Sequence, residues 1–463
     1  MRPRWAGRQS LGLVLGPTLF ALTLLLAPEG LEWKPRAVAA LTLWMATWWL
    51  AEALPLAATA LLPLLMLPLM GVAPMETLAS RYADPIIFLL IGGFLIATAI
   101  ERWGLHRRFA WGVLRLVGTR PRLVLGGVMF VTASLSGWIS NTATTMLVLP
   151  VATSIIGTMV EGQERERFAS ALLLGVAYSA TIGGVGTLVG TAPNLIFSGA
   201  YRSLTGREVS FLEWMNYGLP LALLMWMAAW LYLGFGYTRD AGRGGHLFKI
   251  APIDTGPWTR EQGLVLAVFL SVALLWVTRP FWGKGWPLLT DASIAIGGAV
   301  ALFLLPARGG SRLLGTGEIK DLPWDVVLLL GGGLALAHAF TASGLDTWLA
   351  GKLTALQGLP PALVIAVVVA VIVFATELAS NTAIASITLP VAGSLALSLG
   401  VDPFPLMLAV TFAASLAFML PVGTPPNAIV FGTGRFTLTD MAKAGWWMNL
   451  ISVAIITIYM VLR

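Results

Sequence analysis

Long apolar stretches follow one another along almost the whole chain, and only short polar connections separate them. Most are long enough to cross a hydrocarbon core of about 30 Å as helices. About eleven can be counted, near residues 10–27, 37–51, 53–72, 123–139, 166–182, 216–236, 263–278, 290–306, 361–379, 403–420 and 445–462. The pattern predicts an all-α polytopic membrane protein of about eleven transmembrane helices.

The chain also contains an internal repeat, visible as matching segments at a fixed separation. Segments 240 positions apart match at Gly92-Gly93 and Gly332-Gly333, Gly104-Leu105 and Gly344-Leu345, Ser140–Ala143 and Ser380–Ala383, and Leu149–Ala152 and Leu389–Ala392. A fifth pair, Gly-Thr-Ala-Pro-Asn at 190–194 and Gly-Thr-Pro-Pro-Asn at 423–427, is 233 positions apart. Because all five pairs occur in the same order, they indicate a duplication.

The distribution of charge predicts that the repeat is inverted. Residues 101–122 carry six arginines and one acid, whereas the matching residues 341–362 carry only Asp346 and Lys352. Positive residues mark the cytoplasmic side of a membrane protein, so matching segments are expected on opposite sides. Each half then has a first block of plain apolar helices (1–122 and 263–362) and a second block with the polar motifs (123–237 and 363–463), joined by a cytoplasmic linker at 238–262.

Composition narrows the possible functions further. The chain is 57% hydrophobic and 11% charged and has no cysteine, which excludes disulfides and thiolate metal sites. Its net charge of +7 comes from arginines in short loops beside apolar runs, which is typical of cytoplasmic loops and not of nucleic-acid binding. Arg2, Arg4 and Arg8 precede an apolar run that leads straight into a second run, which favours an uncleaved first helix with a cytoplasmic N-terminus.

The repeated Ser-Asn-Thr segments are good helix N-caps, and a helix that begins inside the bilayer points unpaired N–H groups at a cavity. Each is preceded four residues earlier by another hydroxyl, Ser136 and Thr376. The Gly-Thr elements interrupt a helix and leave carbonyl oxygens free. Hydroxyl, amide and carbonyl oxygens are hard ligands that suit sodium, and paired broken helices indicate a transporter's substrate site.

An anionic substrate would meet no Arg or Lys within these motifs. It would have to be held by helix N-termini, Asn and Thr donors and bound cations, and this couples the anion to sodium. Glu377, beside the second motif, is either a functional carboxylate or an acceptor for backbone donors around the break. His338 either relays protons or makes a hydrogen bond in the core.

With these motifs and "MATWWLAEALPLAATALLP" at 45–63, nearly the whole chain resembles the divalent anion:sodium symporters, which include bacterial dicarboxylate carriers. The resemblance implies two re-entrant hairpins with Ser-Asn-Thr tips, a homodimer built on scaffold domains (the first blocks), and transport domains (the second blocks) that move as an elevator. It also implies a multi-pass protein of the bacterial cytoplasmic membrane. The expected substrates are di- or tricarboxylates such as succinate, malate, fumarate or citrate.

The resemblance implies at least two sodium sites. The first would use Ser136, Ser140, Asn141 and the carbonyl of Gly190, and the second Thr376, the carbonyl of Ala379, Asn381 and the carbonyl of Gly423. Substrate carboxylates would meet Asn141, Thr142, Thr191, Asn381, Thr382, Thr424 and Pro425. Ala192 stands where the second half has Pro425, a departure that removes no proposed ligand side chain.

Other functions stay open at this point. A sodium-independent dicarboxylate exchanger, a proton-coupled carrier and a permease for sulfate would use the same fold. A sodium/proton antiporter needs a titrating acid in the broken helices, and Glu377 has only Gly137 at the matching position of the first half. An intramembrane enzyme needs a nucleophile and base or a metal cluster, and the sequence offers no such group.

Overall fold

The computed structural model describes residues 5–26, 30–159, 162–237, 255–352 and 358–463. Residues 238–254 of the predicted linker, together with Arg2 and Arg4, lie outside the described residues. Within the described part the chain is helical, and its one β-type pairing is an isolated bridge between Pro306 and Arg312.

The helices divide between the two halves of the repeat. The first half contains α1 (Trp5–Leu25), α2 (Trp33–Ala51), α3 (Leu56–Thr59), α4 (Leu62–Leu69), α5 (Met75–Tyr82), α6 (Pro85–Arg102), α7 (Leu105–Leu114), α8 (Pro121–Ser136), α9 (Asn141–Gly157), α10 (Gln163–Val185), α11 (Ala192–Thr205) and α12 (Phe211–Tyr237). The second contains α13 (Arg260–Trp282), η1 (Gly283–Gly285), α14 (Asp291–Leu304), η2 (Arg308–Gly310), α15 (Thr316–Lys320), α16 (Trp324–Ser343), α17 (Leu345–Lys352), α18 (Pro361–Ala375), α19 (Asn381–Ser398), α20 (Pro403–Ser415), α21 (Pro425–Phe431) and α22 (Leu438–Val461).

The prediction of an all-helical, polytopic membrane protein is confirmed. Among the described residues, eight helices are long and apolar enough to cross a membrane, and six shorter apolar helices accompany them. Three of these spans lie outside the eleven apolar runs of the sequence pattern: α19, which begins at the polar Ser-Asn-Thr segment, and the spans that contain α6 and α16. The apolar parts of the last two are shortened by polar residues, Asp84 and Glu101 around α6 and Asp325 and His338 in α16, which explains why a count of long runs missed them.

Three of the predicted runs are interrupted. The run at 53–72 starts as helix only at α3, because Glu52 adopts a left-handed backbone with φ of 50° and Pro55 precedes α3. It is then divided into α3 and α4 just before Pro63, which has no N–H to continue a helix. The runs at 123–139 and 361–379 end early, at the C-caps Gly137 and Thr376 of α8 and α18. After each end the chain turns back into another helix, α9 or α19.

The repeat is visible in how these helices begin and end. Both α8 and α18 begin with a proline, Pro121 and Pro361, at a position where the missing N–H costs nothing. They end within one residue of the same register, and α9 and α19 then begin at Asn141 and Asn381, again 240 positions apart. The later breaks lie between α10 and α11 in the first half and between α20 and α21 in the second.

The interior of the protein is built around α10 and α20. Every residue of α10 from Ala171 to Val185 is buried, and so is every residue of α20 except Pro405. In the first half α10 packs against α8, α9 and α12, and in the second half α20 packs against α18, α19 and α22. In each half, therefore, the helix that leads into a break is enclosed by its neighbours.

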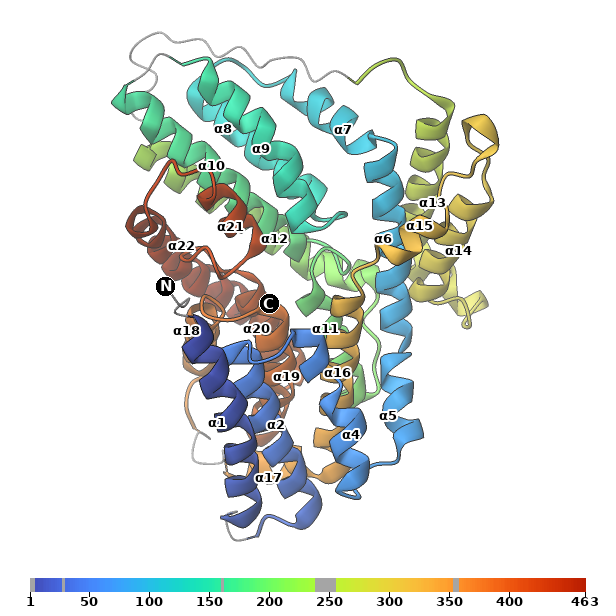
Figure 1. The fold of residues 1–463 in the computed structure, drawn as a ribbon, viewed down its shortest axis with the longest axis vertical. Helices are drawn as coiled ribbons and strands as arrows, with labels where there is room; N and C mark the ends of the chain where they lie inside the picture. The colour runs from blue at the N-terminus through green and yellow to red at the C-terminus, as the bar shows by residue number, and fades with distance from the viewer. Residues whose placement is uncertain (1–4, 27–29, 160–161, 238–254, 353–357) are drawn as a thin grey trace.

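The remaining helices lie to the side of this interior. In Figure 1, α6, α13 and α14 form a column at the right, α8, α9 and α10 lie at the upper left, and α1, α2 and α17 lie at the lower end. The helix α16 connects the column with the lower end, since it packs against α6 as well as α2 and α17, and it also packs against α5, α11 and α19. The buried side chains of α2, α4 and α16 form a second, smaller apolar cluster, separate from the main core.

Candidate functional site

The first Ser-Asn-Thr segment forms the tip between α8 and α9. Ser140 is the N-cap of α9, and its Oγ accepts a hydrogen bond from the N–H of Ala143 at 3.1 Å. The second segment forms the matching tip between α18 and α19, where Ser380 is the N-cap residue but its side chain makes no cap hydrogen bond. The cap interpretation of the motif therefore holds for Ser140, and the side chain of Ser380 is left available.

At each tip, three oxygen atoms meet around a single hydroxyl proton. The Oγ of Ser136, which is completely buried, lies 2.6 Å from Oδ1 of Asn141 and 2.6 Å from the carbonyl oxygen of Ala180. A hydroxyl has one proton to donate, so it can satisfy only one of these two acceptors at a time. Three close oxygens that share one proton form a group suited to a hard cation.

The second tip repeats this arrangement. The Oγ1 of Thr376, also completely buried, lies 2.7 Å from Oδ1 of Asn381 and 2.8 Å from the carbonyl oxygen of Ala414. The amide orientation of Asn381 is fixed, because its Nδ2 donates to the carbonyl of Ser415 at 3.2 Å. The structure thus places an equivalent oxygen cluster at both tips, on residues that the internal repeat relates.

Two buried asparagines hold the breaks open in the same way. Asn194 donates from Nδ2 to the carbonyls of Gly184 (3.0 Å) and Thr187 (2.7 Å), and Asn427 donates to those of Ala417 (3.2 Å) and Leu420 (3.1 Å). All three pairs of matching residues are 233 positions apart. Each asparagine therefore replaces the backbone donors that an unbroken helix would supply to these carbonyls.

The break of the first half brings a predicted ligand close to the first tip. A Cβ atom at Gly184 would lie 2.8 Å from Oδ1 of Asn141 and 3.1 Å from the carbonyl oxygen of Gly190. A Cβ at Gly190 would in turn lie 2.4 Å from the carbonyl oxygen of Gly184. Only glycine allows this approach, so Asn141 and the Gly190 carbonyl, both predicted ligands, meet here.

The two halves are interlocked at these elements. The helix α11, whose N-cap is Thr191, packs on α19 from the second half, and α21, whose N-cap is Thr424, packs on α9 from the first. The crossing joins each break to the tip of the other half. Of the predicted substrate contacts, Asn141, Thr142, Thr191, Asn381 and Thr382 are half-buried, Thr424 is buried and Pro425 is exposed.

Glu377 accepts backbone hydrogen bonds around the second break. Its carboxylate receives the N–H groups of Phe418 at 2.6 Å, Met419 at 2.9 Å and Leu420 at 3.0 Å, and Nδ2 of Asn449 at 2.9 Å. These contacts agree with the acceptor interpretation of this residue. The carboxylate also approaches the position that a Cβ at Gly423 would take, at 3.0 Å, so it borders the carbonyl predicted for the second sodium site.

The first half makes the same connection with different chemistry. Gly137 matches Glu377, and its carbonyl accepts a hydrogen bond from the hydroxyl of Thr187, which matches Leu420. Tip and break are thus tied together in both halves, by a hydroxyl in one and by a carboxylate in the other. The absence of an acid at Gly137 consequently does not leave the first break without support.

Several residues at the site carried no functional expectation from the sequence. The asparagines Asn194 and Asn427 stood inside the repeated elements, and their repetition was the signal that could have identified them. The carbonyls of Ala180 and Ala414 belong to plain apolar helices and gave no signal. Arg8 donates to the carbonyl of Leu378 at 3.0 Å, so the first helix touches the second tip, a contact that only the tertiary structure places.

Comparison with known proteins gives a consistent result along the chain. Residues 10–462 match the family described as sodium:sulfate symporter transmembrane region. A sodium-dependent dicarboxylate transporter, SdcS, of Staphylococcus saprophyticus is 42% identical over 97% of this chain and 90% of its own length. The SdcS of Staphylococcus aureus is 41% identical over 98% of this chain and 91% of its own length.

Two solved structures resemble the fold. The YdaH transporter of Alcanivorax borkumensis aligns over 92% of this chain and 98% of its own, with a TM-score of 0.59 and 16% identity. MtrF of Neisseria gonorrhoeae aligns over 98% of this chain and 94% of its own, with a TM-score of 0.55 and 14% identity. At these identities the likeness concerns the fold alone.

Proposed function

Since the chain belongs to the sodium:sulfate symporter family, we propose that it moves di- or tricarboxylate anions, of the succinate, malate, fumarate and citrate class, across a membrane together with sodium. Two relatives that are 41–42% identical to it over nearly their whole length are named sodium-dependent dicarboxylate transporters. A transporter, and no enzyme, is what this family membership indicates.

The observation that carries the proposal is the pair of oxygen clusters at the tips. In each cluster, an amide oxygen and a helix carbonyl oxygen both lie within 2.8 Å of one hydroxyl oxygen. A sodium ion at each cluster would satisfy the acceptors that the hydroxyl proton cannot. The ligand set also includes Ser140 and the Gly190 carbonyl on the first side, and the carbonyls of Ala379 and Gly423 on the second.

The substrate would bind between the tips. The helices α9, α19 and α11 begin there, so their free N–H groups and the positive ends of their dipoles face the same region. The half-buried side chains of Asn141, Thr142, Asn381 and Thr382 add neutral donors. No Arg or Lys lies in these motifs, so the sodium ions supply the positive charge that offsets the free-energy cost of removing two carboxylates from water.

The movement that exposes this site to either side follows from the predicted inverted repeat. We propose that the second blocks, 123–237 and 363–463, move as an elevator against scaffold blocks 1–122 and 263–362 in a homodimer of the bacterial cytoplasmic membrane, with the N-terminus in the cytoplasm. Cysteines introduced singly at the repeat-related positions 115 and 355, the second of which lies outside the described residues, should be labelled from opposite sides of the membrane. Labelling from the same side would contradict the inverted arrangement.

The direct test is uptake of labelled succinate into proteoliposomes under an inward sodium gradient, compared with choline and with a proton gradient. Accumulation driven by sodium supports the proposal, and competition by malate, fumarate, citrate and sulfate then ranks the substrates. Uptake that requires only internal dicarboxylate and ignores sodium would instead establish an exchanger. Uptake that follows the proton gradient would establish a proton-coupled carrier, and both outcomes would reject the sodium role of Ser136 and Thr376.

A further inference from the structure

A cavity of about 390 Å³ lies between α5, α6, α11 and α16, away from the Ser-Asn-Thr tips. Its polar lining consists of Arg81, Asp84, Arg202, Ser203, His338 and Thr341. On α11, Arg202 follows Thr191 by eleven residues, which at the rise of an α-helix corresponds to about 16 Å along the axis. A short dicarboxylate cannot span this distance, so the cavity is separate from the site described above.

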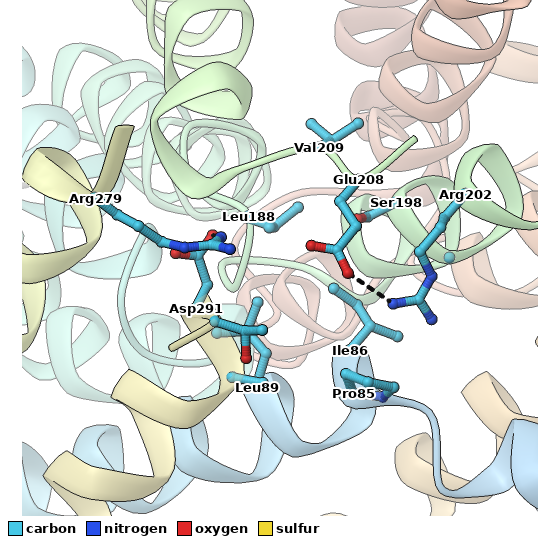
Figure 2. A pocket seen from close by; sticks show the side chains of 13 residues that line it. Pro85, Ile86, Leu89, Leu188, Ser198, Arg202, Glu208, Val209, Arg279 and Asp291 are labelled. Carbon is cyan, nitrogen blue, oxygen red and sulfur yellow. Dashed lines mark hydrogen bonds and ion pairs between the residues drawn. The ribbon is translucent and has the colours of Figure 1, made fainter. Parts of the chain in front are cut away.

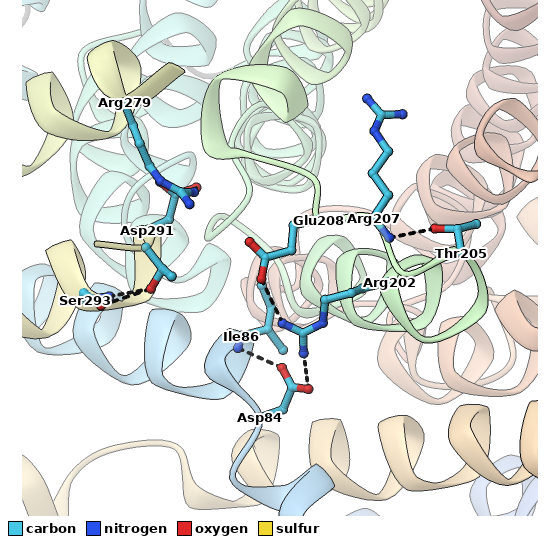
Figure 3. Close-up of polar contacts among 10 residues, drawn as sticks. Asp84, Ile86, Arg202, Thr205, Arg207, Glu208, Arg279, Asp291 and Ser293 are labelled. Carbon is cyan, nitrogen blue, oxygen red and sulfur yellow. Dashed lines mark hydrogen bonds and ion pairs between the residues drawn. The ribbon is translucent and has the colours of Figure 1, made fainter. Parts of the chain in front are cut away.

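The one carboxylate in the lining is already engaged. Asp84 is the N-cap of α6, where its Oδ1 accepts the N–H of Ile86 at 3.0 Å, and its Oδ2 forms an ion pair with Arg202. Arg202 reaches Glu208 with its other nitrogen at 3.4 Å, so it stands between two acids (Figure 3). Both acids are therefore engaged with Arg202, and neither pairs with a second arginine among the described residues.

Arg81 is the second arginine of the lining, and no acid among the described residues forms an ion pair with it. It makes no ion pair or hydrogen bond with any described residue, and its Nε is buried without a partner. The side chains of Ser203, His338 and Thr341 also make no hydrogen bond with any described residue. The cavity therefore holds several donors that no acceptor among the described residues satisfies.

A neighbouring hollow shows what a satisfied arrangement looks like. It has a volume of about 40 Å³ and is lined by Arg202 and Glu208 on one side and Arg279 and Asp291 on the other (Figure 2). Arg279 pairs with Asp291 at 3.2 Å, so two arginines face two acids there. The larger cavity beside it differs in both respects, because it has room for a small organic ion and contains an arginine, Arg81, that pairs with no acid among the described residues.

We propose that this cavity binds a small dianion, held through a carboxylate or similar oxyanion group by the guanidinium of Arg81. The hydroxyls of Ser203 and Thr341 and the ring of His338 supply further donors to the same ligand. Such a charge-assisted contact is among the stronger hydrogen bonds, and a partly buried arginine favours it. The site adds a second anion position to the protein, which would hold a dianion beside the helix α11 that leads to the central site.

The competing structural explanation is that Arg81 only stabilises a helix end. It lies in the last turn of α5, where a cation interacts favourably with the helix dipole. That role predicts a change in stability on substitution that is the same with and without anions. The anion site predicts instead that stability rises with anion concentration and that this rise depends on Arg81.

The test measures the thermal midpoint of the full-length protein in detergent micelles against rising concentrations of succinate or sulfate, with chloride at matched ionic strength as reference. Anion binding at the central site is weakened in two separate samples. One is the variant Asn381→Ala, which lacks a donor of that site, and the other is the wild type in sodium-free buffer, which serves if the variant folds poorly. We expect a dianion-specific rise on the order of 2 °C or more in both samples. Arg81→Gln should abolish the rise, whereas the matched control Arg115→Gln, at an exposed arginine, should retain it.

The outcomes separate cleanly. No dianion-specific rise in the sodium-free wild type, or a rise that survives Arg81→Gln, would overturn the proposal. The phosphate of an anionic lipid headgroup is also an oxyanion that Arg81 could bind. The series is therefore repeated with micelles that contain either phosphatidylglycerol or phosphatidylcholine. A rise caused only by phosphatidylglycerol, with none from free dianions, would also overturn it. Since no transport is measured, the result does not depend on whether sodium drives uptake.

Discussion

Replacing Glu377 by glutamine is expected to weaken the activation of transport by sodium while leaving transport at saturating sodium largely intact. The carboxylate accepts four hydrogen bonds: three reach Oε1, from Phe418, Met419 and Asn449, and one reaches Oε2, from Leu420. A glutamine can place its carbonyl oxygen where Oε1 lies and keep the first three. Its amide nitrogen then faces the N–H of Leu420, so one bond is lost and two donors confront each other.

The cost follows from that single change. Leaving a buried donor without its charged acceptor costs about 1–3 kcal/mol. Leu420 is adjacent in structure to Gly423, because the N–H of Gly423 donates to the Leu420 carbonyl at 3.1 Å, and the Gly423 carbonyl is a predicted sodium ligand. If the whole cost appears in sodium binding, the sodium concentration for half-maximal uptake rises by roughly 5-fold to 150-fold.

The assay is the sodium dependence of labelled succinate uptake into proteoliposomes at fixed pH. Glu166→Gln serves as the matched control, since Glu166 is an exposed carboxylate of α10 that pairs with Arg435 at 3.2 Å. The control should keep the wild-type sodium dependence. An unchanged sodium dependence in Glu377→Gln would refute the reasoning, and so would complete loss of uptake at saturating sodium, which is the result that an obligatory proton carrier predicts.

Three further changes have defined expectations. Thr376→Val removes the only proton of the second oxygen cluster and one of its oxygens, so sodium activation of uptake should weaken by about 5-fold or more. The buried control Thr411→Val should have no such effect, because among the described residues its hydroxyl bonds only to Met407 of its own helix. Asp84→Asn keeps the cap of α6 but removes the ion pair to Arg202 of α11, which crosses the proposed boundary between scaffold and transport blocks. The conformation described here should lose about 1 kcal/mol of stability relative to one in which α6 and α11 separate, and the rate of a cross-link between the two helices should change. An unchanged rate would show that the two helices do not separate. Burial lowers the pKa of His106 in the short helix α7, so as the pH falls below about 6.5 this histidine takes up a proton in the unfolded chain before it does in the folded one. The free energy of unfolding should therefore drop by up to about 1.4 kcal/mol per pH unit until the lowered pKa is reached. Thermal midpoints of the wild type and His106→Gln at pH 7.5 and 5.5 measure this, and an equal loss in both would exclude His106 as its source.

The sequence by itself determined the class of protein and the residues at the two tips. Apolar runs of membrane length are a local property, and so is the repetition of Ser136, Asn141 and their counterparts Thr376 and Asn381. The hydroxyl and the asparagine are only five residues apart, across one turn of chain, so their meeting in the structure follows from local geometry. The breaks were predictable for the same reason, because glycine and proline end helices wherever they stand.

The tertiary structure decided every contact between segments that are distant in the chain. The Ala180 and Ala414 carbonyls, which belong to apolar helices, complete the oxygen clusters. Every residue has a backbone carbonyl, so the sequence does not indicate which carbonyl will act as a ligand. Whether Glu377 faces an open cavity or binds three backbone donors depends on how the chain leaves α20 beside it, 41 to 43 residues later.

The same limit applies to the boundary between the first and second blocks. Arg81, Arg202 and His338 are separated by more than a hundred residues each, and only the packing of α5, α11 and α16 gathers them around one cavity. Single-chain periodicity reports which face of a helix avoids water, but not which helix covers that face. Charge pairing between such residues is therefore a property of the fold, and only the fold shows that Arg81 has no ion-pair partner among the described residues.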